Sequence, residues 1–200
     1  MTDSNLQLLE PLCAVARRAG EAIMTIYATD FAVRDKNDAS PVTEADEKAE
    51  AVILAELARL TPDIPVISEE AAAAGRIPKV EQRFWLVDPL DGTKEFISRN
   101  GEFTVNIALI DNGRPVLGVV LAPALGKTGR LFSGVVGQGA WVEDDAGRRA
   151  IRCRAVPEAG MTVVASRSHG DAAALDAFFA ERQIKVASLA SAGSSLKLCL

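Results

Sequence analysis

The chain has 200 residues, 48% hydrophobic and 24% charged, a globular composition that excludes wholesale disorder. A formal net charge of −5 argues against nucleic acid or an anionic membrane as the main partner, although a metal ion could still bridge the chain to a small anion. Three widely spaced cysteines fit a reducing compartment, and neither a signal peptide nor a membrane-length apolar run is visible. We therefore expect a soluble, cytoplasmic protein.

The first 60 residues predict two helices joined by a polar loop. Apolar residues recur with helical spacing over residues 4–28 and again over residues 42–60, and residues 34–41 form the polar loop between them. Thr43 and Asp46 stand three residues apart, which is the spacing of a capping box at a helix start.

The next segments predict strands. Residues 64–70 and 83–89 have the pattern of two short buried strands, and residues 103–154 alternate with a β period over five further strands. The sequence Asp-Asn-Gly at 111–113 is a strong hairpin signal. The sequence Gly-Lys-Thr at 126–128 lacks the earlier glycine of a P-loop, so we predict a hairpin turn there.

The pattern changes again after Pro157. A strand is predicted over 161–166, a helix over 171–182, a strand over 184–190, and the first turns of another helix over 194–200. This alternation places a domain boundary near residue 155, which gives domains over 1–155 and 156–200. Because the apolar run stops at Leu200 without a cap or a polar tail, we expect the second domain to be incomplete and the chain to be truncated.

Two pairs of carboxylates follow the first two predicted strands. Glu69 and Glu70 close one strand, and Asp88 and Asp91 close the next. If the strands are neighbours, four acidic groups share one small region, where like charges repel unless a cation compensates them. Carboxylates, carbonyls and waters are the ligands that Mg²⁺ prefers. Asp-Pro and Asp-Gly also occur in ordinary turns, so a simple turn remains the alternative.

The turn after the second strand adds groups that suit a phosphate. Pro89 rigidifies the approach, the carbonyl of Leu90 lies between the two aspartates, and Gly92 lets an oxyanion come close to the backbone. A helix beginning near 92–93 would offer free N–H groups. Thr93 is expected to orient a water with Glu70 as its base, which is the chemistry of a metal-assisted phosphate hydrolase. The haloacid dehalogenase signature is excluded, because two residues separate the aspartates where that signature has one.

Four segments of the chain together resemble the inositol monophosphatase superfamily. They are PVTEADEKAE, PVISEE, WLVDPLDGTKEFISRNGEFTVNIALI and GVVLAPALG. The similarity is closest to its 3′(2′),5′-bisphosphate nucleotidase branch, the CysQ type, because Lys-Glu-Phe follows Asp-Gly-Thr and because ASRSH and GSSLKLCL are also present. The resemblance implies an α+β / α/β fold, the layered sugar-phosphatase sandwich. Its α+β domain would hold most ligands, and its smaller α/β domain would close over the nucleotide.

The resemblance also implies an activity and a set of roles. The activity is the lithium-sensitive, Mg²⁺-dependent removal of the 3′-phosphate from adenosine 3′,5′-bisphosphate to give AMP, in sulfate assimilation. Two or three Mg²⁺ ions are expected. The implied metal ligands are Glu69, Asp88, the Leu90 carbonyl and Asp91. The implied substrate contacts are Glu69, Leu90, Asp91, Gly92 and Thr93. The implied catalytic residues are Thr93, Glu70 and Asp46, where Asp46 lies near a third-metal, lithium-sensitive region unless it serves only the capping box.

Other positions carry weaker expectations from the same resemblance. Lys36 belongs either to the site or to a solvated loop, and residues 165–169 and 193–197 either face the nucleoside or serve as a loop and a helix cap. The partner would be a small phosphorylated nucleotide, with a homodimer and a peripheral association with the inner membrane left open. The family's later W-D-x-A-A-G-like motif is absent, so the second metal site is expected to be incomplete.

Two alternatives remain open. One is a phosphatase of inositol phosphate or another sugar phosphate, which the pocket around 94–96 and the segment 165–169 would distinguish from the nucleotidase. The other is a truncated, catalytically deficient remnant that binds metal, which the missing motif favours.

Overall fold

The computed structural model describes residues 2–29, 33–35, 41–166 and 172–200. The helices are α1 (Thr2–Tyr27), α2 (Glu44–Leu60), α3 (Glu69–Ala73), α4 (Thr93–Ile97) and α5 (Ala172–Glu181), with a single 3₁₀ turn η1 (Ser195–Leu198). The strands before residue 123 are β1 (Val33–Asp35), β2 (Pro41–Thr43), β3 (Val66–Ser68), β4 (Arg83–Asp91), β5 (Thr104–Asp111) and β6 (Arg114–Ala122). The later strands are β7 (Arg130–Val135), β8 (Gly139–Asp144), β9 (Gly147–Ile151), β10 (Met161–Ser166) and β11 (Val186–Ala192).

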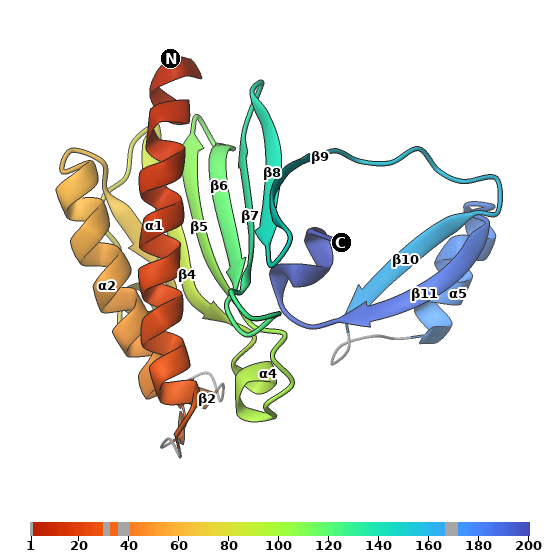
Figure 1. Cartoon of the computed structure of the whole chain (residues 1–200), viewed down its shortest axis with the longest axis horizontal. Coiled ribbons are helices and arrows are strands. Elements are labelled where there is room, and N and C mark those ends of the chain that lie inside the picture. The colour runs from red at the N-terminus through yellow and green to blue at the C-terminus, as the bar shows by residue number, and fades with distance from the viewer. Residues whose placement is uncertain (1, 30–32, 36–40, 167–171) are drawn as a thin grey trace.

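A seven-stranded sheet organises the larger part of the molecule. Its strands follow in chain order from β3 to β9, with β3 and β4 parallel and every later pair antiparallel. α1 and α2 lie side by side across one face of this sheet, and the C-terminal turn lies near its other side (Figure 1). β10 and β11 form a separate parallel pair with α5 between them in the chain. Residues 152–160 connect the two sheets, and the predicted domain boundary near residue 155 lies in this connection. A division into two domains stays a prediction.

The main core fills the space between the two long helices and the sheet. The predicted apolar face of α1 is buried, including Leu12, Val15 and Ile23. The helix lies close to β6, because a Cβ added at Gly20 would come within 2.7 Å of a methyl group of Leu121. Trp85 of β4 is buried in this core, and its indole N–H donates to the Thr61 hydroxyl at 2.9 Å. The core therefore fixes β4, the strand that leads to the acidic turn.

The two turn predictions of the β region hold. Asn112 and Gly113 have φ angles of 50° and 73° between β5 and β6, and a two-residue hairpin of type I′ needs positive φ at both positions. Residues 126–128 lie in the connection between β6 and β7, as predicted. There the backbone N–H groups of Lys127 and Thr128 and the Thr128 hydroxyl donate to the carboxylate of Asp145.

Three expectations about elements were wrong. Residues 33–35 and 41–43, at and beside the expected polar loop, pair as the antiparallel strands β1 and β2. Glu69 and Glu70 do not end a strand but form the first turn of the short helix α3. The final helix is only the single turn η1. In the described part of the chain, no helix is both long enough and apolar enough to cross a membrane.

Candidate active site

β3 and β4 are parallel neighbours in the sheet, which is the arrangement that would bring the acidic residues at their ends together. Val66 to Ser68 pair with Trp85 to Val87, so the two strands end at the same edge of the sheet. Glu69 follows β3 directly, and Asp88 is the next residue of β4. The prediction that the two acidic strand ends lie side by side is therefore confirmed.

An irregularity in β4 turns both aspartates to one side. Asp88 lies opposite Asn106 and Asp91 opposite Thr104, so two residues of β4, Pro89 and Leu90, oppose a single residue of β5. Residues three apart on a regular strand face opposite sides, but a bulge adds one residue and restores the same side. Because Thr104 and Asn106 are two apart on β5 and share a face, Asp91 and Asp88 share it too.

Gly92 holds the conformation that ends this strand. Its φ of 91° and ψ of 46° lie in the left-handed region, where other residues are strained. A Cβ there would also meet the Cβ of Ser194 at 3.1 Å and the backbone Cα of Phe103 at 3.4 Å. Thr93 then begins α4, as predicted near 92–93. α4 has only five residues, so its dipole is weak.

Asp91 is the carboxylate whose surroundings are most perturbed. Burial raises its pKa most, and the nearby charges of Glu95 and Glu69 raise it further. The backbone N–H of Ser195, which donates to Asp91 Oδ2, and the charge of Lys197 act in the opposite direction. Asp91, Glu95 and Glu69 thus form a group of acidic side chains close enough to influence one another.

Asp46 and Glu70 lie on the helices beside this edge. Asp46 is fully buried in the first turn of α2, and Glu50 follows it by one turn on the same face. The carboxylate of Glu50 accepts a hydrogen bond of 3.1 Å from the backbone N–H of Ala71, in α3. α2 is therefore tied to α3, the helix that carries Glu69 and the half-buried Glu70.

The segment after β11 closes over the same edge. The Gly193 N–H donates to Glu102 Oε2 at 2.8 Å, and the Ser195 hydroxyl donates to Asn106 Oδ1 at 2.7 Å. The Ser194 hydroxyl accepts from the Leu196 N–H at 3.2 Å, so Ser194 serves as a cap, one of the two roles expected for residues 193–197. A Cβ at Gly193 would lie 2.5 Å from Glu95 Cγ, which explains why glycine is required at this approach.

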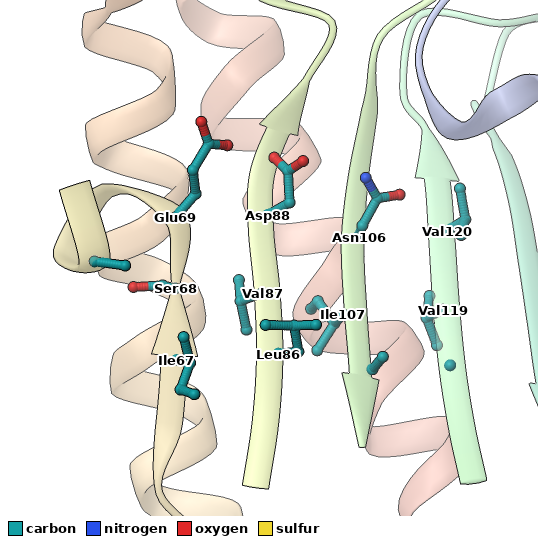
Figure 2. A pocket seen from close by; sticks show the side chains of 13 residues that line it. Ile67, Ser68, Glu69, Leu86, Val87, Asp88, Asn106, Ile107, Val119 and Val120 are labelled. Atoms are coloured by element: carbon teal, nitrogen blue, oxygen red, sulfur yellow. The ribbon is translucent and has the colours of Figure 1, made fainter. Parts of the chain in front are cut away.

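A cavity of about 520 Å³ opens on the sheet face away from α1 and α2. Its walls are mostly apolar, and its polar lining comes from Ser68, Glu69, Asp88 and Asn106. Figure 2 shows the carboxylates of Glu69 and Asp88 pointing toward the same end of this cavity, with the amide of Asn106 beside Asp88. Of the four predicted acidic residues, Glu69 and Asp88 therefore meet at the rim of this cavity, whereas Glu70 and Asp91 do not line it.

The donor set fits a hard divalent cation in its chemistry. Its side chains are carboxylates only, and the raised pKa of Asp91 reflects burial next to like charges, which a cation would offset. As the described residues stand, however, no three His, Cys, Asp or Glu side chains are arranged to hold a metal ion. Asp91 is engaged by Ser195 instead.

Some predicted residues lie elsewhere or outside the described residues. The side chain of Leu90 is buried in the core, so only its backbone carbonyl is available as a ligand. Phe96 is fully buried against Tyr27 and Phe103, with ring centroids about 5 Å apart, so it does not line a substrate pocket as expected. Lys36 and residues 167–169, including His169, are outside the described part.

Sequence reasoning missed two polar residues at this edge, Glu102 and Asn106. Asn106 carried a signal that could have been read, because it is an amide in the middle of an otherwise apolar strand. Ser195 lies in the predicted segment 193–197, but its contact with Asp91, 104 residues away in the chain, gave no signal in the sequence.

Comparison with known proteins identifies relatives of this chain in sequence and in fold. The model of the inositol monophosphatase family matches residues 4–200. The chain is 50% identical over 196 residues to the 3′(2′),5′-bisphosphate nucleotidase CysQ of Escherichia coli O157:H7 and to that of Salmonella typhimurium, covering 96% of this chain and 76% of each relative. The crystal structure of CysQ from Bacteroides thetaiotaomicron superposes with a TM-score of 0.73 at 32% identity, covering 100% of this chain and 76% of that one.

These similarities confirm the predicted fold class, a mixed α+β arrangement with a large sheet flanked by helices. Enzymes of the family are generally Mg²⁺-dependent, in keeping with the all-oxygen donor set. The chain belongs to the inositol monophosphatase family.

Proposed function

We propose that this chain is a Mg²⁺-dependent phosphomonoester hydrolase that removes the 3′-phosphate from adenosine 3′,5′-bisphosphate and releases AMP. The observation that carries the proposal is the bulge at 89–90, which turns Asp88 and Asp91 to one side at the edge where Glu69 follows β3. Identity of about one half to relatives named 3′(2′),5′-bisphosphate nucleotidase supports a small phosphorylated nucleotide as the substrate.

The residues that would hold two or three Mg²⁺ ions are Glu69, Asp88, the Leu90 carbonyl and Asp91. Bound there, the metal would supply Lewis acidity and a water of lowered pKa. Glu69 would also contact the phosphate of the substrate. Gly92 and Thr93, where β4 ends and α4 begins, would contact the phosphate through their backbone.

Thr93 and Glu70 orient and deprotonate the attacking water. The Thr93 hydroxyl orients the water, and the Glu70 carboxylate takes its proton. The water oxygen bonds to phosphorus as the bond from phosphorus to O3′ breaks, and O3′ takes up a proton to become the free 3′-hydroxyl. Asp46, buried in the first turn of α2, would serve a third-metal, lithium-sensitive region of the site.

Other parts of the account remain proposals about the whole protein. We assign the metal and phosphate residues to a domain over 1–155 and the nucleoside contacts to a second domain that begins at 156. A homodimer is testable by size-exclusion chromatography with light scattering. A cytoplasmic location, with or without peripheral membrane association, is testable by cell fractionation.

One observation favours a second candidate, a catalytically deficient form that binds metal weakly. Asp91 is engaged by the Ser195 N–H, and no ready group of three metal-binding side chains is present in the described residues. This candidate predicts weak Mg²⁺ binding by calorimetry and no turnover of any phosphate ester.

Turnover assays separate these functions. Phosphate release is measured from adenosine 3′,5′-bisphosphate and from inositol 1-phosphate, with and without Mg²⁺ and lithium. The proposal expects Mg²⁺-dependent, lithium-sensitive release that favours the nucleotide. Preference for the inositol ester would make the chain a sugar phosphatase, and release without Mg²⁺ would contradict the metal assignment.

Two variants test the roles assigned around the water. Glu70→Gln removes the base and Thr93→Val removes the hydroxyl, and removal of a general base is expected to lower kcat by roughly 10²- to 10⁴-fold. Glu81→Gln, at an exposed position before β4, is the matched control and should leave kcat unchanged. If Glu70→Gln keeps full activity, another group is the base.

A further inference from the structure

Three polar side chains form a connected row beside Asp88 and Asp91. Thr104 and Asn106 lie two apart on β5, on the face that both aspartates share. Ser195, from η1, lies between them: its Oγ is 2.8 Å from Thr104 Oγ1 and 2.7 Å from Asn106 Oδ1. Thr104 is fully buried, so this row links the C-terminal segment to the floor of the site.

The direction of these hydrogen bonds follows from the hydrogens available. A hydroxyl carries one hydrogen, and a carbonyl oxygen only accepts. If Ser195 donates to Asn106 Oδ1, the 2.8 Å contact needs Thr104 as its donor, and the Thr104 hydroxyl shares its hydrogen with Ser194 Oγ, 3.3 Å away. The order then runs from Thr104 to Ser195 to Asn106. A flipped amide would reverse the whole row, with the Asn106 nitrogen donating to Ser195.

The charge of Asp88 decides between these two orientations. Asp88 lies directly opposite Asn106 in the register, so their side chains are about 4.5–5.5 Å apart at Cβ. A flipped amide would direct its oxygen at a carboxylate, acceptor against acceptor. In the observed orientation the amide nitrogen is on the side of Asp88 and the oxygen is on the far side (Figure 2).

The cavity beside Asp88 has few side chains that can donate a hydrogen bond. Glu69 and Asp88 only accept when ionised, and the other lining residues, apart from Ser68 and Asn106, are apolar. The Ser68 hydroxyl points away from Asp88 in Figure 2. A phosphate group needs donors as well as a cation to bind its several oxygens, and the amide of Asn106 is the side-chain donor placed beside the acidic rim.

We propose that Asn106 is a substrate-binding residue whose amide N–H donates to a phosphate oxygen at the cavity rim, and that Ser195 is a positioning residue that holds the amide oxygen on the side away from Asp88 by donating to it. This inference rests on the proposed phosphatase function. It gives the C-terminal segment a role in phosphate recognition that a helix cap alone would not have. Thr104 completes the row by donating to Ser195.

The first test observes the amide directly and needs no turnover. The Asn106 side-chain signal in an ¹⁵N-labelled protein is assigned by its loss in Asn106→Asp, and inorganic phosphate is titrated in the presence of Mg²⁺. The proposal expects this signal to shift saturably, with the same dissociation constant as the backbone signal of Gly92. A Gly92 shift without any Asn106 shift would overturn the inference and leave the phosphatase proposal standing.

The second test asks whether the Ser195 hydroxyl positions the Asn106 amide or only supports the local structure. Ser195→Ala removes the hydroxyl but keeps the backbone N–H that binds Asp91, and loss of one such hydrogen bond is expected to weaken phosphate binding by about 2- to 13-fold. Ser195→Thr keeps a hydroxyl and should restore affinity to within about twofold of the wild type. Ser188→Ala, which removes a 3.0 Å hydroxyl contact in the other sheet, is the matched control and should change nothing.

The outcomes are distinct. Unchanged affinity in Ser195→Ala, or failure of Ser195→Thr to rescue a loss, would overturn the positioning role. If neither Gly92 nor Asn106 responds to phosphate and no ester is hydrolysed, the proposed function itself fails.

Discussion

Replacing Gly92 by alanine tests the claim that backbone geometry shapes the site. At a φ of 91° a Cβ is strained by about 1–2 kcal/mol. The new methyl group would also lie 3.1 Å from the Cβ of Ser194 and 3.4 Å from the Cα of Phe103. The Ser194 Cβ is attached directly to the backbone and cannot rotate away, so overpacking should add about 1–3 kcal/mol.

Gly113→Ala is the matched control for the strain alone. Gly113 also has positive φ, 73°, but a Cβ there meets no atom within 4 Å. Its substitution should therefore cost only the strain of about 1–2 kcal/mol. The difference between the two variants isolates the crowding at the site.

The assay is urea unfolding followed by tryptophan fluorescence, to which Trp85, buried in the native core, and Trp141 contribute. Gly92→Ala should lose at least about 1 kcal/mol more than Gly113→Ala, the lower bound of the overpacking cost. For a chain of this size each kcal/mol corresponds to a fall of roughly 2–4 °C in Tm. Equal losses in the two variants would refute the close approach of the C-terminal segment to Gly92.

Three further predictions concern other parts of the chain. The Lys127 N–H and then the Thr128 hydroxyl lower the pKa of Asp145 below 3.8, so its stabilising contribution is present above about pH 4 and is lost as the pH falls through the lowered value. Asp145→Asn should lower Tm at pH 7, and this difference should shrink at acid pH; a constant difference would contradict the argument. Burial raises the pKa of Cys199 to about 11, so at pH 8 iodoacetamide should modify the exposed Cys153 well before Cys199. Mass spectrometry follows the labelling, and equal labelling rates of the two thiols would contradict the burial of Cys199. Leu196→Ala should cost about 2–5 kcal/mol locally and speed hydrogen exchange of the Ser195 amide, whereas unchanged exchange would show that Leu196 does not anchor the segment.

The sequence predicted best where the structure depends on local chemistry. The pair Asn112 and Gly113 predicts a type I′ turn, because this turn needs positive φ at both central positions and Asn and Gly tolerate it. The alternation over 103–154 predicts strands because one side of each packs on the core. The two acidic strand ends predict a shared edge once their strands are assumed to be neighbours.

Features that depend on distant segments could not be predicted in this way. The bulge at Pro89–Leu90 is visible only from the pairing of β4 with β5, and without it Asp88 and Asp91 would face opposite sides. Phe96 looked like part of a pocket but is buried against Tyr27, almost 70 residues earlier in the chain. The contact of Ser195 with Asp91 and Asn106 likewise needs the whole fold.

The most direct test of the central claim is ³¹P NMR of adenosine 3′,5′-bisphosphate incubated with the chain and Mg²⁺. The account predicts that the 3′-phosphorus signal is replaced by inorganic phosphate while the 5′ signal persists, and that Asp88→Asn stops this conversion while Asp63→Asn, at an exposed position, does not. Loss of the 5′ signal instead, or full activity in Asp88→Asn, would contradict it.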